Sequence, residues 1–273
     1  MTTRRYGGPN GYGLNHDPAG HMRTPLSRLV CAGRTPAQSS LARFLTGPWD
    51  QGQTGRCTGF AKKRGIYVRT AKMAADGEKI SPMLVSATGV YTFARCVDRE
   101  PDARGKLPKL RDDGAMPNQV TRSTQLWGVV LERDWPIPDD KVTSKTVNNE
   151  PLFEEIGEAS ALRLEGEYTL RRGTSFVGQF RSAIAAGFPV EFSIDVTDAF
   201  ENYSGGILEK LEGESTGAHR LLAYGYYTDP SGLTIAEVCN SWGDWGEDGN
   251  CRGDVGFISS WQDAHVLSVR PRD

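Results

Sequence analysis

The periodicity of the apolar residues changes halfway along the chain, and this change most restricts the fold. Between residues 57 and 127, apolar side chains recur at helical intervals, as at Phe60, Ile66 and Val68. From residue 189 onward, short apolar runs of strand length dominate. A helical half followed by a strand-rich half predicts an α+β chain with two lobes.

Local signals at helix ends set the limits of the individual elements. A helix is expected from Cys57 to about Ala71, and a second from Ser81 to about Cys96, because Ser-Pro places a cap before a proline at the first helical position. Glycine ends two further helices, over residues 121–127 and 175–186. The expected strands cover residues 189–194, 219–227, 233–239, 255–258 and 265–269.

The chain divides into three segments by composition. Residues 1–45 are rich in glycine, proline, histidine and arginine, which predicts an extended N-terminal arm. Residues 46–145 form the expected helical lobe, and residues 146–273 form the expected β-rich lobe. A chain of 273 residues is long enough for one large domain or for two half-domains around a shared cleft.

Composition and charge exclude several function classes. The formal net charge is −2, and the chain has no basic arm and no run of about 18 apolar residues, so neither a nucleic acid nor a membrane is expected as a partner. No paired Cys-x-x-Cys and no phosphate-binding glycine loop occur, and no metal or cofactor is expected. The five cysteines are odd in number and scattered, which favours reduced thiols over a disulfide framework. We expect a cytoplasmic monomer without a secretory signal.

Cys57 follows a glycine-rich loop and begins the first expected helix. The segment Gln51–Ala61 holds three glycines around it. Unpaired N–H groups and partial positive charge at a helix N-terminus favour the thiolate, which is the nucleophilic form, and Arg56 adds a positive charge nearby. Gln51 can direct an amide N–H toward an oxyanion above the sulfur. An isolated cysteine at a helix start is more often structural, so the interpretation depends on two further segments.

His219 and Asn240 supply the partners that such a cysteine needs. His219 begins one apolar run, and Asn240 directly follows another. An asparagine amide can accept the second N–H of the histidine, which fixes the orientation and tautomer of the ring. Trp242 and Trp245 can cover this hydrogen bond and exclude water. Either segment alone could be structural, but the three segments together predict a thiol nucleophile with an oriented base.

Taken together, these segments resemble those of the papain-like (C1) cysteine peptidases. QGQTGRCTGFA is similar to the cysteine segment of that family, GAHRLLAYGY to its histidine strand, and NSWGDWGEDG to its asparagine-tryptophan motif. The resemblance covers residues 45–273. It implies a helical left lobe and an antiparallel, β-barrel-like right lobe, with the active-site cleft between them.

The resemblance also implies a role for each catalytic residue. Cys57 attacks the peptide bond and forms a thioester acyl-enzyme, His219 is general base and then general acid, and Asn240 orients the histidine. Gln51 supplies the side chain of the oxyanion hole, shared with the backbone N–H of Cys57. The implied activity is that of a thiol peptidase that hydrolyses polypeptides.

A second group of residues is implied to bind the substrate. Gly114 and Ala115 would pair with an extended peptide by strand addition. Met116 and Pro117 would line the pocket for the second residue before the scissile bond. Trp242 is placed at the substrate site, where it also shields the histidine and asparagine pair.

Departures from the family pattern leave other functions open. Thr54 stands where secreted members carry a disulfide cysteine, and the leader before Cys57 is shorter than the usual inhibitory propeptide. In these respects the chain is similar to leaderless bacterial or phage members. The alternatives are a catalytically weak or inactive binding protein that keeps the fold, and a thiol amidase, peptidoglycan hydrolase or acyl transferase that keeps the chemistry.

Overall fold

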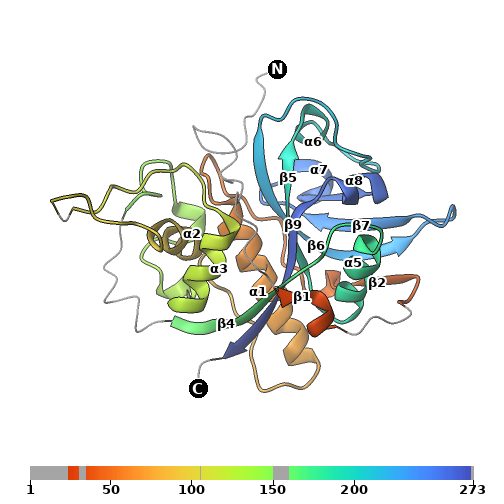
Figure 1. Ribbon diagram of the computed structural model, residues 1–273, viewed down its shortest axis with the longest axis horizontal. Coiled ribbons are helices and arrows are strands. Elements are labelled where there is room, and N and C mark those ends of the chain that lie inside the picture. The colour runs from red at the N-terminus through yellow and green to blue at the C-terminus, as the bar shows by residue number, and fades with distance from the viewer. Residues whose placement is uncertain (1–23, 31–34, 105, 150–159, 272–273) are drawn as a thin grey trace.

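Three helices form one side of the molecule, and a large sheet with shorter helices forms the other (Figure 1). The computed structural model describes residues 24–30, 35–104, 106–149 and 160–271, so most of the predicted arm lies outside the described residues. The three helices are α1 (Cys57–Ala75), α2 (Ala87–Cys96) and α3 (Pro117–Leu126). The predicted α+β class is confirmed, and most strands of the sheet follow these helices in the chain, although two short strands precede them.

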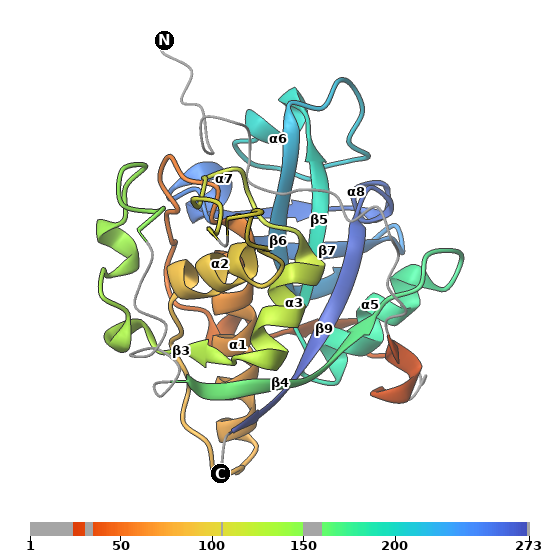
Figure 2. The ribbon, with the colours of Figure 1, turned by 60° about the vertical axis from the view of Figure 1, so that its left-hand side comes forward.

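Helix α1 runs through the middle of the molecule, between the other two helices and the sheet (Figure 2). It is buried on almost every side, as at Phe60 and Ile66. Gly59 permits the close approach of α2, because a Cβ there would lie 2.1 Å from the carbonyl oxygen of Ala87. α1 therefore packs against both lobes and determines the position of Cys57, its first residue.

Helix α2 begins later than predicted. Ser81 is not its cap, because the segment that follows is not helical and Val85 pairs with Leu131 in an isolated antiparallel bridge. The helix begins after Ser86, whose hydroxyl accepts a hydrogen bond from the backbone N–H of Gly89 at 3.0 Å. Pairing with a distant segment thus overrides the local Ser-Pro signal.

Glycine ends two of the helices where the sequence predicts it. Helix α3 is followed by Gly128, and helix α5 (Phe176–Ala185) is followed by Gly187, each with a φ of +83°. Glycine adopts this left-handed conformation at little cost. The start of α3 at Pro117, in contrast, is earlier than predicted.

In the described part of the chain, nine strands form one mixed sheet. Their order is β1-β4-β9-β5-β6-β7-β8, with β2 pairing with β6 and β3 pairing with β4. All pairs are antiparallel except the parallel pair of β1 and β4. The expected barrel-like closure is not found among these strands, because the order ends in different strands, β1 and β8. The strands are β1 (Thr24–Pro25), β2 (Gln38–Ser40), β3 (Val129–Val130), β4 (Ser160–Thr169), β5 (Val190–Val196), β6 (Gly217–Thr228), β7 (Thr234–Cys239), β8 (Asn250–Gly253) and β9 (Gln262–Pro271).

Short helices follow the strands of the second lobe. Two of them are α6 (Asp198–Glu201) and α7 (Trp245–Asp248). The predicted strand at 255–258 is wrong, because this segment is helix α8 (Val255–Ser259). The carboxylate of Asp254 accepts hydrogen bonds from the backbone N–H groups of Gly256 at 2.7 Å and Phe257 at 3.1 Å. This aspartate cap outweighs the strand preference of a short apolar run.

Strands β5 and β6 direct alternate side chains to opposite faces of the sheet. In their register, Ile194 lies opposite His219, and Ser193 lies opposite Arg220. Ile194 belongs to the large apolar core of the second lobe, which also holds residues of α5 and α8. Arg220 points the other way, toward Glu191, whose carboxylate also pairs with Lys62 of α1.

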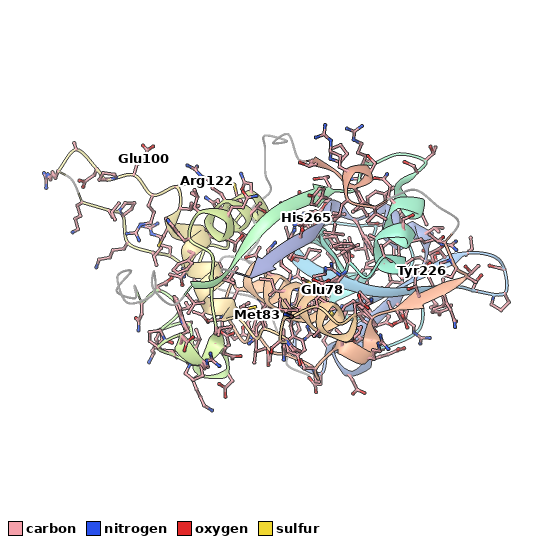
Figure 3. The ribbon with its side chains drawn as sticks, turned by 90° about the horizontal axis from the view of Figure 1, so that it is seen from below. Glu78, Met83, Glu100, Arg122, Tyr226 and His265 are labelled. Carbon is pink, nitrogen blue, oxygen red and sulfur yellow. The ribbon has the colours of Figure 1, made fainter. Side chains whose placement is uncertain are left out.

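A buried ionic cluster joins α1 to this second face. Lys62 Nζ lies 3.4 Å from Glu167 Oε1 and 3.2 Å from Glu191 Oε2, and Arg220 Nε lies 3.4 Å from Glu191 Oε2. His265 Nε2 lies 2.5 Å from Glu167 Oε1, near the middle of the molecule (Figure 3). Each of these five side chains is at most 7% exposed, so they compensate one another in place of water. We call this group the interlobe cluster.

Candidate active site

Cys57 lies against the start of strand β6. Its side chain contacts Ala218, and the backbone N–H of Arg220 donates toward its sulfur. These two neighbours flank His219 in the chain. The packing of α1 on β6 thus brings together residues that are far apart in sequence.

The environment of Cys57 favours the neutral thiol. Complete burial raises the pKa of the Cys57 thiol to about 12, because a thiolate loses its hydration there. The backbone N–H groups of Arg220 and Thr58 lower it, but by less. The direction is opposite to the one that the helix N-terminus predicts, because burial outweighs these dipoles.

His219 and Asn240 form a buried hydrogen bond between neighbouring strands. His219 Nε2 lies 2.7 Å from Asn240 Oδ1, and the same oxygen accepts a bond from the backbone N–H of Ser241 at 2.7 Å. Asn240 directly follows β7, which pairs with β6. Because the amide oxygen can only accept, Nε2 carries a proton, and a neutral ring then has its lone pair on Nδ1.

Aromatic rings cover this hydrogen bond. The ring of Trp242 lies 4.4 Å from the His219 ring, centroid to centroid, at an angle of 31°. Phe200 packs on Trp242 at 5.6 Å and on Trp245 at 4.6 Å. Trp242 is 1% exposed, so it excludes water from the pair and presents almost no surface of its own. The backbone carbonyl of Glu201 accepts a bond from the indole N–H of Trp245 at 3.1 Å.

Gln51 is held at both ends of its amide. Its Oε1 accepts a hydrogen bond from the Ser241 hydroxyl at 2.7 Å, and its Nε2 donates to the backbone carbonyl of Thr54 at 2.7 Å. The backbone N–H of Gln51 also donates to the Ser241 carbonyl at 2.9 Å. Gln51 is fully buried, and Ser241, to which it is hydrogen-bonded, directly follows Asn240, so Gln51 lies in the same part of the site as the His219–Asn240 pair.

The segment from Gly114 to Pro117 is tied to the loop before Cys57. The N–H of Gly114 donates to the Tyr91 hydroxyl at 3.0 Å, and this hydroxyl donates to Asp112 Oδ1 at 2.8 Å. The same oxygen of Asp112 accepts a bond from the N–H of Gly55 at 2.9 Å.

The predicted substrate residues of this segment differ in exposure. Ala115 is fully buried in the core of the helical lobe, together with Ile66. Met116 is half-buried, and Pro117 is the buried first residue of α3. Of these residues, only Met116 presents a side chain that is partly open to solvent.

Asp139 lies beside the site and was not predicted for it from the sequence, whereas Arg56 was expected only as a positive charge near Cys57. Arg56 and Asp139 are buried, and Arg56 Nη1 lies 3.6 Å from Asp139 Oδ1. Asp139 Oδ2 also lies 2.8 Å from Lys63 Nζ. The sequence showed Arg56 next to Cys57, but nothing local to residue 139 indicates that it reaches the nucleophile loop.

Other site types are not found in the described part of the chain. No group of three or more histidine, cysteine, aspartate or glutamate residues could hold a metal ion there. None of the helices described is long and apolar enough to cross a membrane. Cys57, Cys96, Cys239 and Cys251 are free thiols, and Cys31 lies outside the described residues.

The sequence profile of the papain family of cysteine proteases matches residues 114–257, which is more than half of the chain. The chain belongs to this family. His219 and Asn240 lie within the matched region, whereas Gln51 and Cys57 precede it.

Similar curated proteins match this papain-family chain over short stretches. It is 38% identical over 71 residues to the cathepsin B-like protein CP3 of Giardia intestinalis, which is 26% of this chain and 24% of that protein. It is 39% identical over 74 residues to cathepsin L of Sarcophaga peregrina, or 26% of this chain and 22% of that protein. The chain thus spans about a quarter of the length of these relatives.

Solved structures match this papain-family chain along most of its length. Xylellain, a cysteine protease from Xylella fastidiosa, superposes with a TM-score of 0.72 at 19% identity, covering 98% of this chain and 99% of that one. Procathepsin L2 of Tenebrio molitor gives a TM-score of 0.69 at 22% identity, covering 94% of this chain and 78% of that one. These likenesses establish the papain-like, two-lobed fold.

Proposed function

We propose that this protein is a cysteine-type peptidase that hydrolyses peptide bonds through Cys57, His219 and Asn240. The observation that carries the proposal is the 2.7 Å hydrogen bond between His219 Nε2 and Asn240 Oδ1. This bond directs Nδ1 of the ring as the basic nitrogen. Cys57, at the start of α1, contacts Ala218, the residue directly before this histidine. All of these groups come from one chain, so the proposed site needs no residue from a second copy.

The first chemical step transfers a proton and forms a thioester. As the sulfur of Cys57 attacks the carbonyl carbon of the scissile bond, its proton passes to Nδ1 of His219. In the resulting imidazolium, the Nε2–H group still donates its hydrogen bond to Asn240, and the Nδ1 proton passes to the departing amine. The peptide bond breaks, and the acyl group remains on the sulfur.

The second step hydrolyses the thioester. The neutral His219 accepts a proton from a water molecule, whose oxygen attacks the acyl carbon. The carboxylic acid is released, and the proton returns to the sulfur as Cys57 becomes a thiol again. Burial raises the pKa of the Cys57 thiol to about 12, which supports a resting enzyme with a neutral thiol. In such an enzyme His219 must accept the thiol proton during the attack.

Gln51 and the backbone N–H of Cys57 are the proposed donors to the oxyanion. An amide nitrogen has two protons, and Gln51 donates one of them to the Thr54 carbonyl. The second proton can stabilise the negative charge that develops on the substrate oxygen. Loss of one such donor typically lowers kcat by about 10²- to 10³-fold.

The proposed substrate is an extended polypeptide that lies along Gly114 and Ala115. Cys57 is 0% exposed, so the sulfur reaches a substrate only after the site has opened locally. The pairing of the peptide with Gly114 and Ala115, and the contact of its side chain with Met116 and Pro117, are part of this proposal.

The experiment compares wild type with Cys57→Ala on a fluorogenic peptide amide and on a denatured protein. The wild type should cleave both, and Cys57→Ala should lose activity by about 10³-fold or more. Cys96→Ala, which removes a half-exposed thiol of α2, is the matched control and should keep full activity. An epoxide thiol reagent should label Cys57, as peptide mapping can test.

Two outcomes would contradict the peptidase proposal. Labelling of Cys57 without cleavage of any peptide would favour a binding protein with the papain fold. Cleavage of peptidoglycan fragments but not of polypeptides would favour an amidase that uses the same thiol.

A further inference from the structure

We propose that Arg56 is a positioning residue that holds Gln51 in its oxyanion-binding place, an inference that rests on the proposed peptidase function. Arg56 is 1% exposed, although a guanidinium is costly to bury. Its donors meet acceptors on the loop before Cys57 and on the helical lobe. It does not touch the substrate or the reacting atoms in this arrangement, and it acts through Gln51.

The first part of the argument is the contact between Arg56 and the loop. Arg56 Nη2 donates to the backbone carbonyl of Gln51 at 3.1 Å, and Nε donates to the Thr54 hydroxyl at 2.8 Å. The Thr54 hydroxyl in turn donates to the same Gln51 carbonyl at 2.6 Å. The carbonyl therefore accepts two bonds, which fix the peptide plane from which the Gln51 side chain extends.

The second part is the closure of the loop by Gln51 itself. Its Nε2 donates to the Thr54 carbonyl at 2.7 Å while its own carbonyl receives the Thr54 hydroxyl. Gly52, with a φ of +61°, makes the turn between them. Arg56 spans both ends of this small ring, so its guanidinium limits how far the Gln51 amide can move.

The third part is the anchor on the other side of Arg56. Its Nη1 donates to the Thr88 hydroxyl at 2.8 Å and to the Asp139 carbonyl at 3.2 Å, and it lies 3.6 Å from Asp139 Oδ1. Asp139 also accepts bonds from the backbone N–H groups of Ala87 at 2.7 Å and Thr88 at 2.9 Å. The anchor is therefore the N-terminus of α2, a rigid element, rather than another loop.

Arginine suits this place for a geometric reason. Its planar group carries five N–H donors, so three nitrogens can meet acceptors in different directions. Lysine keeps the charge but donates from one nitrogen, and cannot span Gln51 and Thr88 in the same way. A positive charge alone is therefore not sufficient at this position, because the contacts need several separate N–H donors.

The test is a double-mutant cycle with Arg56→Met, Gln51→Ala and the double variant, assayed for kcat and KM on a fluorogenic peptide amide. Gln51→Ala should lower kcat by about 10²-fold or more, and Arg56→Met should lower it by about 10-fold or more with KM within about 3-fold. In the Gln51→Ala background, Arg56→Met should lower kcat by less than about 2-fold, because residues that act through one group are not additive.

Two further variants separate positioning from general stability. Arg69→Met removes a guanidinium from the far end of α1, where Arg69 packs on the Phe188 ring at 4.1 Å, and it should leave kcat unchanged. If Arg56→Met does not fold, Arg56→Lys replaces it in the cycle, because lysine keeps the charge but cannot donate to Gln51 and to Thr88 at the same time.

Each result has a distinct meaning. The positioning role would be overturned if Arg56→Met, or Arg56→Lys in its place, lowered kcat equally in the wild-type and Gln51→Ala backgrounds. That result would leave the peptidase proposal intact. No loss of kcat in the wild-type background would overturn the positioning role too. A wild type that cleaves no peptide at all would instead overturn the proposed function, and with it any oxyanion role for Gln51.

Discussion

Glu191→Gln should lower the free energy of unfolding by about 3 kcal/mol at pH 7. Burial acts to raise the pKa of Glu191, but the charge of Lys62, a hydrogen bond from His265 and the charge of Arg220 lower this pKa from 4.5 to about 2. Each pKa unit corresponds to about 1.4 kcal/mol, so ionised Glu191 gains about 3 kcal/mol in the folded state. This loss of stability agrees with the typical cost of breaking a buried ion pair, which is about 3–5 kcal/mol.

The pH dependence of this difference follows from the lowered pKa. As pH falls, Glu191 takes up its proton in the unfolded chain near pH 4.5 and in the folded protein only near pH 2. Its contribution is therefore complete above about pH 5 and is lost as pH falls toward 2. The gap in stability between wild type and Glu191→Gln should narrow steadily over that range.

Urea denaturation followed by tryptophan fluorescence, at pH 7, 5, 4 and 3, measures this gap. Glu237→Gln, a half-buried glutamate of β7 outside the interlobe cluster, is the matched control. It should change the free energy of unfolding by less than about 1 kcal/mol at every pH. A Glu191→Gln variant within 1 kcal/mol of wild type at pH 7, or a gap that stays constant down to pH 3, would refute the reasoning.

Three further predictions concern packing, protonation and thiols. Gly59→Ala should lower the free energy of unfolding by about 2–3 kcal/mol, because the new Cβ would lie 2.1 Å from a backbone oxygen of α2; Gly178→Ala, in open space on α5, should not destabilise the protein in the same denaturation assay. Asn240→Asp should shift the limb of the pH–rate profile that reports protonation of the Cys57–His219 pair to higher pH, because a carboxylate at position 240 stabilises the imidazolium. A limb at the same pH as in wild type, or at a lower pH, would contradict the assigned contact. Thiol counting in denaturant without reductant should give at least four free thiols, and a lower number would reveal a disulfide that involves at least one of the described cysteines.

Features encoded within a few residues could be predicted from the sequence. The start of α1 at Cys57, and the glycines after α3 and α5, depend on local helix signals. The adjacency of β6 and β7 follows from their order along the chain and brings His219 beside Asn240. These residues were named from the sequence, and their hydrogen bond is the main geometric support for the proposed site.

Features that depend on distant partners could not be predicted. Helix α2 begins after Ser86 and not at Ser81 as predicted, because Val85 in the segment between them pairs with Leu131. Asp139 reaches Arg56 across 83 positions, and no local pattern records such a contact. The raised pKa of Cys57 has the same origin, because burial comes from the whole fold while the helix N-terminus is local.

Strand β6 makes the chemistry of the molecule depend on the register of one strand. Consecutive residues of this strand serve different purposes, His219 among the aromatic rings and Arg220 within the interlobe cluster. Because side chains alternate with a period of two, one inserted or deleted residue within the strand would exchange the two faces. A guanidinium would then stand among the rings, and an imidazole would replace the guanidinium that pairs with Glu191. The register of β6 against β7 shifts once, between Ala223 and Gly225, beyond the residues that carry these two side chains. Insertions and deletions in homologues should therefore be absent from the regular first half of the strand, residues 217–223, whereas single substitutions there leave its register unchanged.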